Sequence, residues 1–551
     1  MIDNTTRVLK IIVKNQKRGI MKNNNILVCF LLSATTIAML ADNISDSSRL
    51  EATSKSTLTL HPLFVSQSPE MVSSFRNDRN QTRENGHGGA FQAVLFGGVT
   101  SDSEDLARYF FPDAQESLIA AEDGPTPLPG FQIKKNLLSQ DFNVITVNKN
   151  FESTITLAPQ QSVIGLGLHY RQSFWKNHDR GRGFWLSVSS PIMHVKNDMN
   201  FCENVISDGG GADTTVTGVT TVANMTEAFQ QQAWNFGKIV ADSSMKKTGL
   251  GDIEFKIGYE WLQHEPAHTE TYFGLIIPTG NTNEGEYVFE PIVGRGKSWG
   301  VMFGSALGLE IWNNETGDKN LRYELVSHTE FLFDRKQVRS FDLKNRPWSR
   351  YLPVYLNQAQ AQLAATEGAQ YLATPGINVF TQEVNVTPGI ATDVNTAFIF
   401  TVRRFQAEVG YNFLAKRAED VKLACCWKPG PALVHFQGEG RTNPIRTITG
   451  NQYYEQIVTS IVAAPIPAAN ILIPVSLANY NNSLIQETDL DLNSAATPAL
   501  LSNTLYGTLG FQCEDREYPL FGNVGGSYTF SKNNDAVPRR WVMWAKIGVS
   551  F

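Results

Sequence analysis

Charged side chains recur at every second position in several stretches of this chain. Between residues 252 and 260 they alternate with large apolar residues, and the same pattern returns at 321–333. Side chains in a strand point alternately to opposite faces, so each stretch predicts one charged face and one apolar face. The residues that we assign to a water-filled lumen are His169, Arg171, Asp252, Glu254, Lys256, Glu260, Arg322, Glu324, His328, Glu330 and Lys546.

Opposed charges across a narrow wet passage create a transverse field and select among ions. A second interpretation fits the same residues: the charges pair with one another and simply fill a small barrel. The sequence alone leaves both open.

Enzymatic chemistry has little support. Ser327 and His328 are adjacent, and neighbours in a strand point to opposite faces, so they cannot form a nucleophile and base pair within regular pairing. Nine histidines are present, but none has the spacing of a catalytic triad, and no CxxC or CxxxH pattern indicates a metal site. We therefore predict no catalytic residues, no metal and no cofactor.

The elements that must position these charges are long alternating strands. SVIGLGLHYRQSF, GDIEFKIGYEWL, LRYELVSHTEFLFD and LFGNVGGSYTFS each alternate over 9 to 13 residues, and similar runs occur at 183–195, 271–278, 299–311, 405–413 and 503–513. This length is typical of tilted strands that span a membrane. Aromatic residues near the ends of the runs, among them Trp185, Trp261, Trp541 and Trp544, suit the membrane–water interface. Packing in a soluble sandwich is the alternative, although its strands are usually shorter.

The predicted fold class is therefore all-β: an antiparallel up-and-down transmembrane β-barrel of about 12 strands, within a range of roughly 10 to 16, with long loops that contain short helices. Only helices or a closed sheet satisfy every backbone group in hydrocarbon, and no uncharged run of spanning length follows the N-terminal region. The stretches 224–239 and 353–371 have helical composition, and the long inserts form either outer loops or a plug of the lumen.

Composition limits the partners. The chain has 551 residues, 18% of them charged, and a net charge of −6. Soluble domains average about 25% charged residues. The chain has no cluster of Lys and Arg that would neutralise the phosphates of a nucleic acid, so we do not expect nucleic acid as a partner.

The stretch MKNNNILVCFLLSATTIAMLADN, from Met21, is typical of a secretory signal peptide with cleavage near Ala41. Export would remove Cys29 and leave Cys202, Cys425, Cys426 and Cys513, an even number in a setting that permits disulfides of undetermined connectivity. We divide the chain into an N-terminal extension and signal peptide (1–41), a flexible leader (42–85), an N-terminal part of the barrel or plug (86–160), and the barrel (161–551) with inserts at 197–248, 340–395 and 416–502.

Two motifs resemble known families. The run TGLGDIEFKIGYEW (248–261), followed by YFGLIIPTGNTNEG (272–285), resembles the GLGD and PTG hairpin of outer-membrane barrel proteins associated with the meta-pathway of phenol degradation. The stretch WVMWAKIGVSF (541–551) resembles the C-terminal signal of Gram-negative outer-membrane proteins, in which a terminal aromatic follows alternating apolar residues. Phe551, Val549 and Ile547 would form this assembly signal.

These resemblances imply a location in the outer membrane of a Gram-negative bacterium, with outer-membrane lipid, the barrel-assembly machinery and a small solute as partners. The leading predicted function is a channel or facilitated transporter for small solutes, and the first resemblance implies hydrophobic or aromatic compounds. The alternatives are a filled barrel with a structural or surface-display role, and an outer-membrane hydrolase. The sequence indicates no oligomeric state.

Overall fold

The computed structural model describes residues 54–65, 68–73, 88–101, 105–112, 115–122, 137–177, 181–216, 218–264, 266–344, 346–357, 359–360, 373–433, 484–513, 517–531 and 537–551. The signal peptide predicted at 1–41, including Cys29, lies outside the described residues. Among the described residues, no helix is long and apolar enough to cross a membrane.

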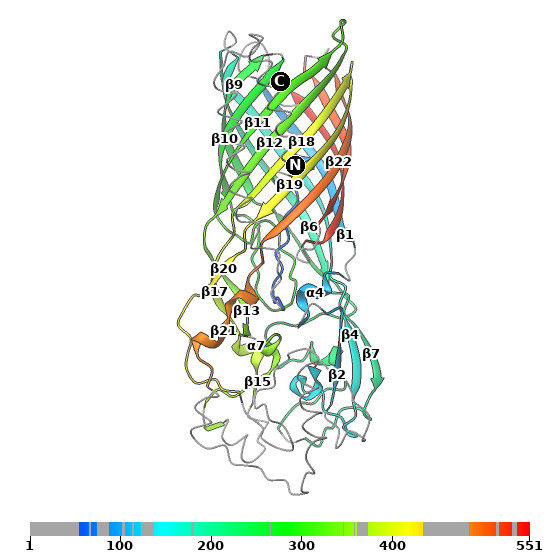
Figure 1. Cartoon of the computed structure of the whole chain (residues 1–551), viewed down its shortest axis with the longest axis vertical. Coiled ribbons are helices and arrows are strands. Elements are labelled where there is room, and N and C mark those ends of the chain that lie inside the picture. The colour runs from blue at the N-terminus through cyan, green and yellow to red at the C-terminus, as the bar shows by residue number, and fades with distance from the viewer. Residues whose placement is uncertain are drawn as a thin grey trace, which may run out of the picture.

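Twelve antiparallel strands form a closed barrel, which confirms the predicted fold class and strand number. The sheet closes because β5 pairs with both β1 and β6, so that no edge of the barrel is left open (Figure 1). The barrel strands are β1 (Gly89–Ser101), β5 (Gln160–Asn177), β6 (Arg182–Asp198), β9 (Ile253–His264), β10 (Ala267–Ile277), β11 (Gly300–Asn313), β12 (Lys319–Leu332), β18 (Ala391–Val402), β19 (Phe405–Lys416), β22 (Leu500–Cys513), β23 (Leu520–Phe530) and β24 (Arg539–Ser550).

The strands form because apolar and polar residues alternate along them. On β24 the residues Trp541, Met543 and Ile547 are exposed, whereas Val542 and Lys546 between them are buried in the barrel. The outward row is therefore apolar, as the spacing predicts. Two aromatic residues differ from the expected interfacial position: Trp185 and Trp544 are buried on the inward face, because each has the opposite parity to the outward row of its strand.

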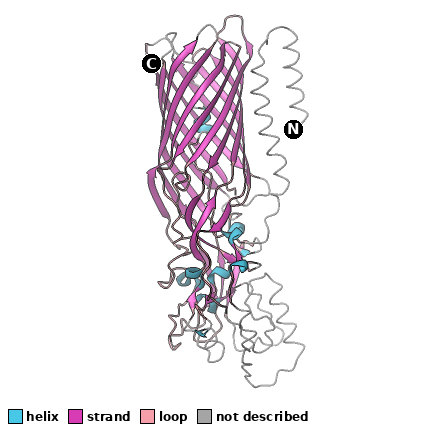
Figure 2. Cartoon of the chain, turned by 90° about the vertical axis from the view of Figure 1, so that its left-hand side faces the viewer, coloured by secondary structure: helices cyan, strands magenta, loops and turns pink. Residues whose placement is uncertain are grey.

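The connections differ sharply between the two ends of the barrel. At one end, where β1 begins and β24 ends, the connections are short, such as 314–318 between β11 and β12 and 403–404 between β18 and β19. At the other end the connections 102–159, 199–252, 278–299, 333–390 and 417–499 are long. Their described parts build a folded region below the barrel, which we call the cap (Figures 1 and 2).

Small sheets and short helices make up the cap, so the predicted short helices within long loops are confirmed. One sheet has the order β3-β2-β4-β7, a second has the order β13-β17-β20, and two-stranded pairs join β14 to β21 and β15 to β16. A further strand, β8 (Met245–Leu250), extends the barrel sheet beside β6. The strands of the cap are β2 (Ser117–Ala121), β3 (Leu137–Leu138), β4 (Glu152–Thr156), β7 (Cys202–Ser207), β13 (Arg335–Ser340), β14 (Asp342–Leu343), β15 (Pro353–Val354), β16 (Thr374–Pro375), β17 (Thr381–Thr387), β20 (Asp420–Leu423) and β21 (Leu490–Asp491). Its helices are α4 (Ala107–Phe110), η2 (Ser139–Phe142), α5 (Met225–Ala228), η4 (Ser349–Tyr351), α7 (Gly376–Val379), η6 (Glu487–Asp489) and η7 (Leu492–Ala495).

The helical composition at 224–239 produces only the single turn α5, capped by the Asn224 side chain, and the chain then turns away. An aromatic core, rather than helix length, holds this part of the cap together: Phe142, Phe229, Trp234, Trp348 and Tyr351 pack with ring centroids 5.1–6.5 Å apart. Burial of such rings is the main source of its stability.

Candidate lumenal site

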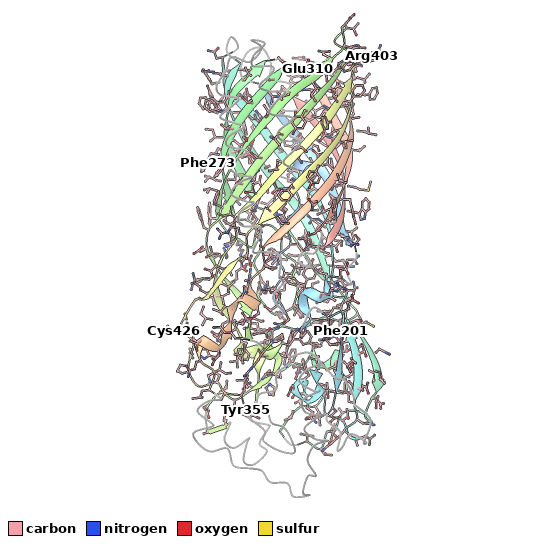
Figure 3. All side chains as sticks on the ribbon, in the orientation of Figure 1. Phe201, Phe273, Glu310, Tyr355, Arg403 and Cys426 are labelled. Atoms are coloured by element: carbon pink, nitrogen blue, oxygen red, sulfur yellow. The ribbon has the colours of Figure 1, made fainter. Side chains whose placement is uncertain are left out.

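Strand β9 shows how alternation sorts the predicted site residues. Glu254, Lys256 and Glu260 are 2–4% exposed on the inward face, whereas Phe255 and Ile257 are 38% and 44% exposed on the outward face. Phe273 on the neighbouring strand β10 likewise projects from the outer surface of the wall (Figure 3). An apolar exterior around a charged interior matches a barrel that sits in hydrocarbon.

Arg295 gathers one group of acids. Its guanidinium lies 2.7 Å from Glu254, 2.5 Å from Glu330 and 3.6 Å from Asp252, and its backbone N–H donates to Asp252. Gly294 makes this approach possible: its φ is +81°, and a Cβ there would lie 2.6 Å from the Asp252 carboxylate. Three predicted lumenal acids therefore share one cation that comes from a connection and not from a strand.

Two further predicted residues join this group. Lys256 lies 3.1 Å from Glu254. His328 shares a 2.6 Å hydrogen bond with the Tyr272 hydroxyl and lies 3.5 Å from Glu330. The group is buried throughout, so its ion pairs act in a medium of low dielectric constant.

A second group surrounds Arg171. Its guanidinium lies 3.0 Å from Glu260 and 3.0 Å from Glu270, and it stacks 4.0 Å above the ring of Trp185. This stacking explains why Trp185 turns inward, because an aromatic face stabilises a desolvated guanidinium.

The other predicted residues are more dispersed. Arg322 lies 3.2 Å from His268, which in turn lies 4.0 Å from Glu324. His169 is buried on β5 opposite Gln92 and Ser189. Lys546 lies 5.1 Å from the centre of the Phe521 ring. The structure thus brings most of the predicted residues into two main groups and leaves His169, Arg322, Glu324 and Lys546 outside both.

The lumen also holds a segment that the sequence assigns to a flexible leader. Residues 54–65 and 68–73 run from the cap into the barrel, and we call them the lumenal segment. Near the cap, Ser56 donates its backbone N–H to Ser494. Farther along, the His61 carbonyl accepts from Arg540, and near the other end the Ser73 carbonyl accepts from Lys546.

Phe64 anchors the lumenal segment to the barrel wall. Its ring stacks on Phe96 at 5.5 Å and occupies the space that Gly167 leaves, since a Cβ at residue 167 would collide with it. The Ser-, Thr- and Asn-rich composition of 42–85 indicates mobility, but the apolar residues Leu63, Phe64, Met71 and Val72 bury themselves against the wall. These few apolar residues within a polar stretch give no periodic signal.

Three cavities flank the lumenal segment at the cap end of the barrel. The volumes within which the centre of a water molecule can move are about 70, 60 and 20 Å³. A single water needs about 10–15 Å³ by this measure, so the two larger cavities each have room for several waters. The lumen is thus narrowed but not solidly packed.

Sequence reasoning missed several of these groups. Arg295 lies in a connection, where residues show no strand periodicity, and Glu270 precedes the alternating run predicted at 271–278. Trp185 was expected at the membrane–water interface, although its parity in the strand places it on the inward face. Parity within each strand would have found Glu270 and Trp185, whereas nothing local indicates Arg295.

The described residues form no catalytic pair at Ser327 and His328: the Ser327 hydroxyl bonds to Ser305 at 2.8 Å, and His328 bonds to Tyr272. Within the described ranges, no group of three or more His, Cys, Asp or Glu is arranged to hold a metal. Cys202, Cys425, Cys426 and Cys513 are free thiols, so the structure does not form the disulfides that an even count permits.

Comparison with protein-family models and with curated proteins finds no match. Among solved structures, the chain is similar to the COG4313 outer membrane channel from Pseudomonas putida F1, with 9% identity, a TM-score of 0.34, and coverage of 86% of this chain and 100% of that one. It is also similar to the transport unit of the autotransporter AIDA-I from Escherichia coli, with 7% identity, a TM-score of 0.30, and coverage of 88% and 97%. The CymD monoaromatic hydrocarbon channel is a third, with 6% identity, a TM-score of 0.27, and coverage of 86% and 89%.

With similarities this low, the architecture rests on the strands and contacts of this chain itself. That architecture is the one expected of an outer-membrane barrel protein: a closed, even-numbered antiparallel barrel with an apolar outer surface.

Proposed function

We propose that this protein is an outer-membrane channel or facilitated transporter for small solutes, with a passage narrowed by the lumenal segment. The observation that carries the proposal is the pair of cavities beside that segment, each with room for several waters, inside a wall of buried charges. A charged wall of this kind can hold water and polar solutes, which an apolar interior would exclude.

We further propose that the cap faces the outside of the cell. Barrels of this class have short turns on the periplasmic side and long loops on the extracellular side. Protease added to intact cells should then cleave the cap while the barrel remains, and full protection of the cap would reverse the orientation.

The charge balance of the wall supports a preference for cations. Seven acidic and three basic residues are buried on the barrel strands: Glu254, Glu260, Glu270, Glu324, Glu330, Asp393 and Glu408, against Arg171, Lys256 and Lys546. Excess fixed carboxylates raise the local concentration of cations. Arg295 offsets part of this excess but does not reverse it.

Planar-bilayer conductance tests the proposal. The parent should conduct, and its reversal potential in a salt gradient should indicate cation preference. Replacing Glu324 and Glu408 by Gln should reduce that preference, whereas Asp420→Asn on the exposed surface of the cap should not.

A second pair of variants tests the lumenal segment. Phe64→Ala should raise the conductance, because it removes the ring that anchors the segment to the wall. Phe91→Ala is the matched control, since Phe91 is 43% exposed on the outer face of β1, the strand that also carries Phe96.

A filled barrel with a structural or surface-display role is the second candidate. The close pairing of Arg295 and Arg171 with lumenal acids favours it, since paired charges can fill a small barrel without a pore. Absence of conductance in both the parent and Phe64→Ala would support this candidate over the channel. An outer-membrane hydrolase remains the least supported alternative.

A further inference from the structure

The second of the three cavities has an incompletely satisfied carboxylate in its wall. Asp393, at the cap end of β18, is only 3% exposed and lines this cavity. One carboxylate oxygen accepts from the Asn412 side chain at 3.2 Å. The other oxygen, Oδ2, has no hydrogen-bond partner among the described residues. Burying a charged oxygen in this way is costly unless something in the cavity neutralises it.

Neutral oxygen ligands surround the same cavity. Ser502 and Thr504 come from β22, and Ser527 and Thr529 come from β23; all four hydroxyl-bearing residues line the cavity and are nearly buried. Thr504 and Thr529 bond to each other at 2.9 Å, but a hydroxyl oxygen has two lone pairs and can still accept from a ligand.

The charges of the lining leave a net negative cavity. Besides Asp393 it contains Glu70, Arg540 and His61. Arg540 donates to the His61 carbonyl at 3.0 Å and interacts electrostatically with Glu70. The charges of Arg540 and Glu70 offset each other, so Asp393 supplies an unbalanced charge of −1.

We propose that this cavity binds one small monovalent cation, either an alkali-metal ion or a primary ammonium group, between the Asp393 carboxylate and the hydroxyl oxygens of β22 and β23. Hard cations and ammonium groups both prefer such oxygen ligands, and the volume of about 60 Å³ admits a small cation but not a bulky one. This inference rests on the proposed channel function and identifies small cations as a class of solute that the lumen binds.

Binding and conduction can fail separately, because binding is measured on the detergent-solubilised full chain and needs no flow across a membrane. The probes are potassium chloride and methylammonium chloride, titrated by calorimetry in a buffer whose only cation is tetrabutylammonium. The parent should bind at one saturable site. Asp393→Asn should weaken binding at least tenfold, and Asp420→Asn on the outer surface of the cap should leave it unchanged.

Ser502→Ala provides a second variant that keeps the carboxylate. It should weaken binding about three- to tenfold, the range expected for one hydrogen-bonding ligand. The heat-modifiable gel mobility of each variant reports whether the barrel has folded.

Potassium binding alone would assign an alkali-ion site, methylammonium binding alone would assign an ammonium site, and binding of both would assign a site that recognises only charge and size. Absence of saturable binding of either probe to the folded parent would overturn the proposal, since the cavity would then hold only water. Equal affinity of the parent and folded Asp393→Asn would overturn it as well.

Discussion

The barrel and the cap place their side chains in opposite ways. In the barrel, large apolar residues such as Met543, 74% exposed, cover the outside, and charged residues such as Glu254 are buried within. In the cap, Phe142, Phe229 and Trp348 form an apolar interior, and charged pairs such as Lys422 with Asp420 lie on the surface. The arrangement of side chains in each region therefore matches its surroundings, hydrocarbon for the barrel and water for the cap.

The interiors differ in how their charges are balanced. The barrel gathers several acids around one guanidinium, as at Arg295, whereas the cap uses separate buried pairs, such as Arg339 with Glu419 at 2.6 Å and Arg350 with Asp342 at 2.6 Å. A shared cation makes the barrel charges around Arg295 interdependent, whereas each of these two cap arginines pairs with one acid. The following variants test this contrast and the independence of the two regions.

The largest expected effect is that of Trp348→Ala in the cap. Trp348 is 2% exposed, donates its indole N–H to the Phe110 carbonyl at 2.8 Å and packs on four aromatic rings. Its loss should destabilise the cap by about 3–5 kcal/mol. Limited proteolysis should then cleave the cap while the barrel keeps its heat-modifiable mobility.

Trp312→Ala is the control, because Trp312 is 47% exposed near the opposite end of the barrel. If Trp348→Ala also abolishes the heat-modifiable barrel, the two regions fold as one unit and the contrast drawn above fails.

A slightly smaller effect is expected from an arginine on the outer wall. Ile257→Arg should destabilise the barrel by about 2–4 kcal/mol, the cost of Arg or Lys at the bilayer midplane. Ile206→Arg in β7 is the matched control: Ile206 is 58% exposed and Ile257 is 44% exposed, but Ile206 lies in the cap. There the same change should stay within about 0.5 kcal/mol.

Denaturant unfolding of the two variants in lipid vesicles measures this difference. Equal destabilisation would mean that both sites face the same solvent.

The barrel and the cap also differ in how much of their structure could be predicted from the sequence. Each barrel strand carries its own evidence, because the alternation at 252–261 or 541–551 is a local pattern with a fixed spatial meaning. Glu254 and Ile257 have opposite parity in one strand, so the sequence assigns them to opposite faces of the sheet. Strand type, approximate number and the polarity of each face were therefore accessible.

The cap has no such period. Its core joins Phe142, Phe229 and Trp348, which are about a hundred residues apart in sequence, and its strands are mostly 2–7 residues long. Arg295 and the lumenal segment are missed for the same reason: their positions depend on where the chain returns after a connection. Local patterns do not encode such returns.

The acid response of the cap should be governed in part by Glu419. Burial alone would raise the pKa of this carboxyl, but Arg339, together with Lys416, outweighs it and lowers the pKa from 4.5 to about 2. Because the pKa is lower in the folded state, the stabilisation is fully present above about pH 4.5 and is lost as the pH falls through 2. The linked loss should be about 3 kcal/mol.

Glu419→Gln should weaken the cap at neutral pH and remove this part of its acid sensitivity, as measured by proteolysis from pH 5 to pH 2. Burial raises the pKa of Asp342, although Arg350 acts to lower it. Asp342 is present in both proteins, so its contribution to the acid sensitivity cancels in the comparison. Glu383→Gln, which breaks an exposed pair with Lys336, should leave the profile unchanged. A parallel profile for parent and Glu419→Gln would contradict the assignment.

The smallest effect on stability is expected at the last residue. The Phe551 backbone exchanges two hydrogen bonds with Gly89, at 2.8 and 2.9 Å, and Phe551→Ala retains both. The variant loses the stacking of the Phe551 ring on Tyr170 at 6.3 Å and the packing of that ring over Gly89, so the folded barrel should be destabilised by about 1 kcal/mol. We propose that the ring matters more for assembly, because the terminal aromatic and the apolar row of Val549 and Ile547 form the predicted signal. The amount of heat-modifiable barrel in the membrane should therefore fall several-fold, while export and the stability of the assembled fraction change little.

Phe530→Ala, which removes a comparable stack on Tyr528 at the cap end of the barrel, should cost similar stability without reducing assembly. Equal yields from the two variants would show that Phe551 acts only through its local contact.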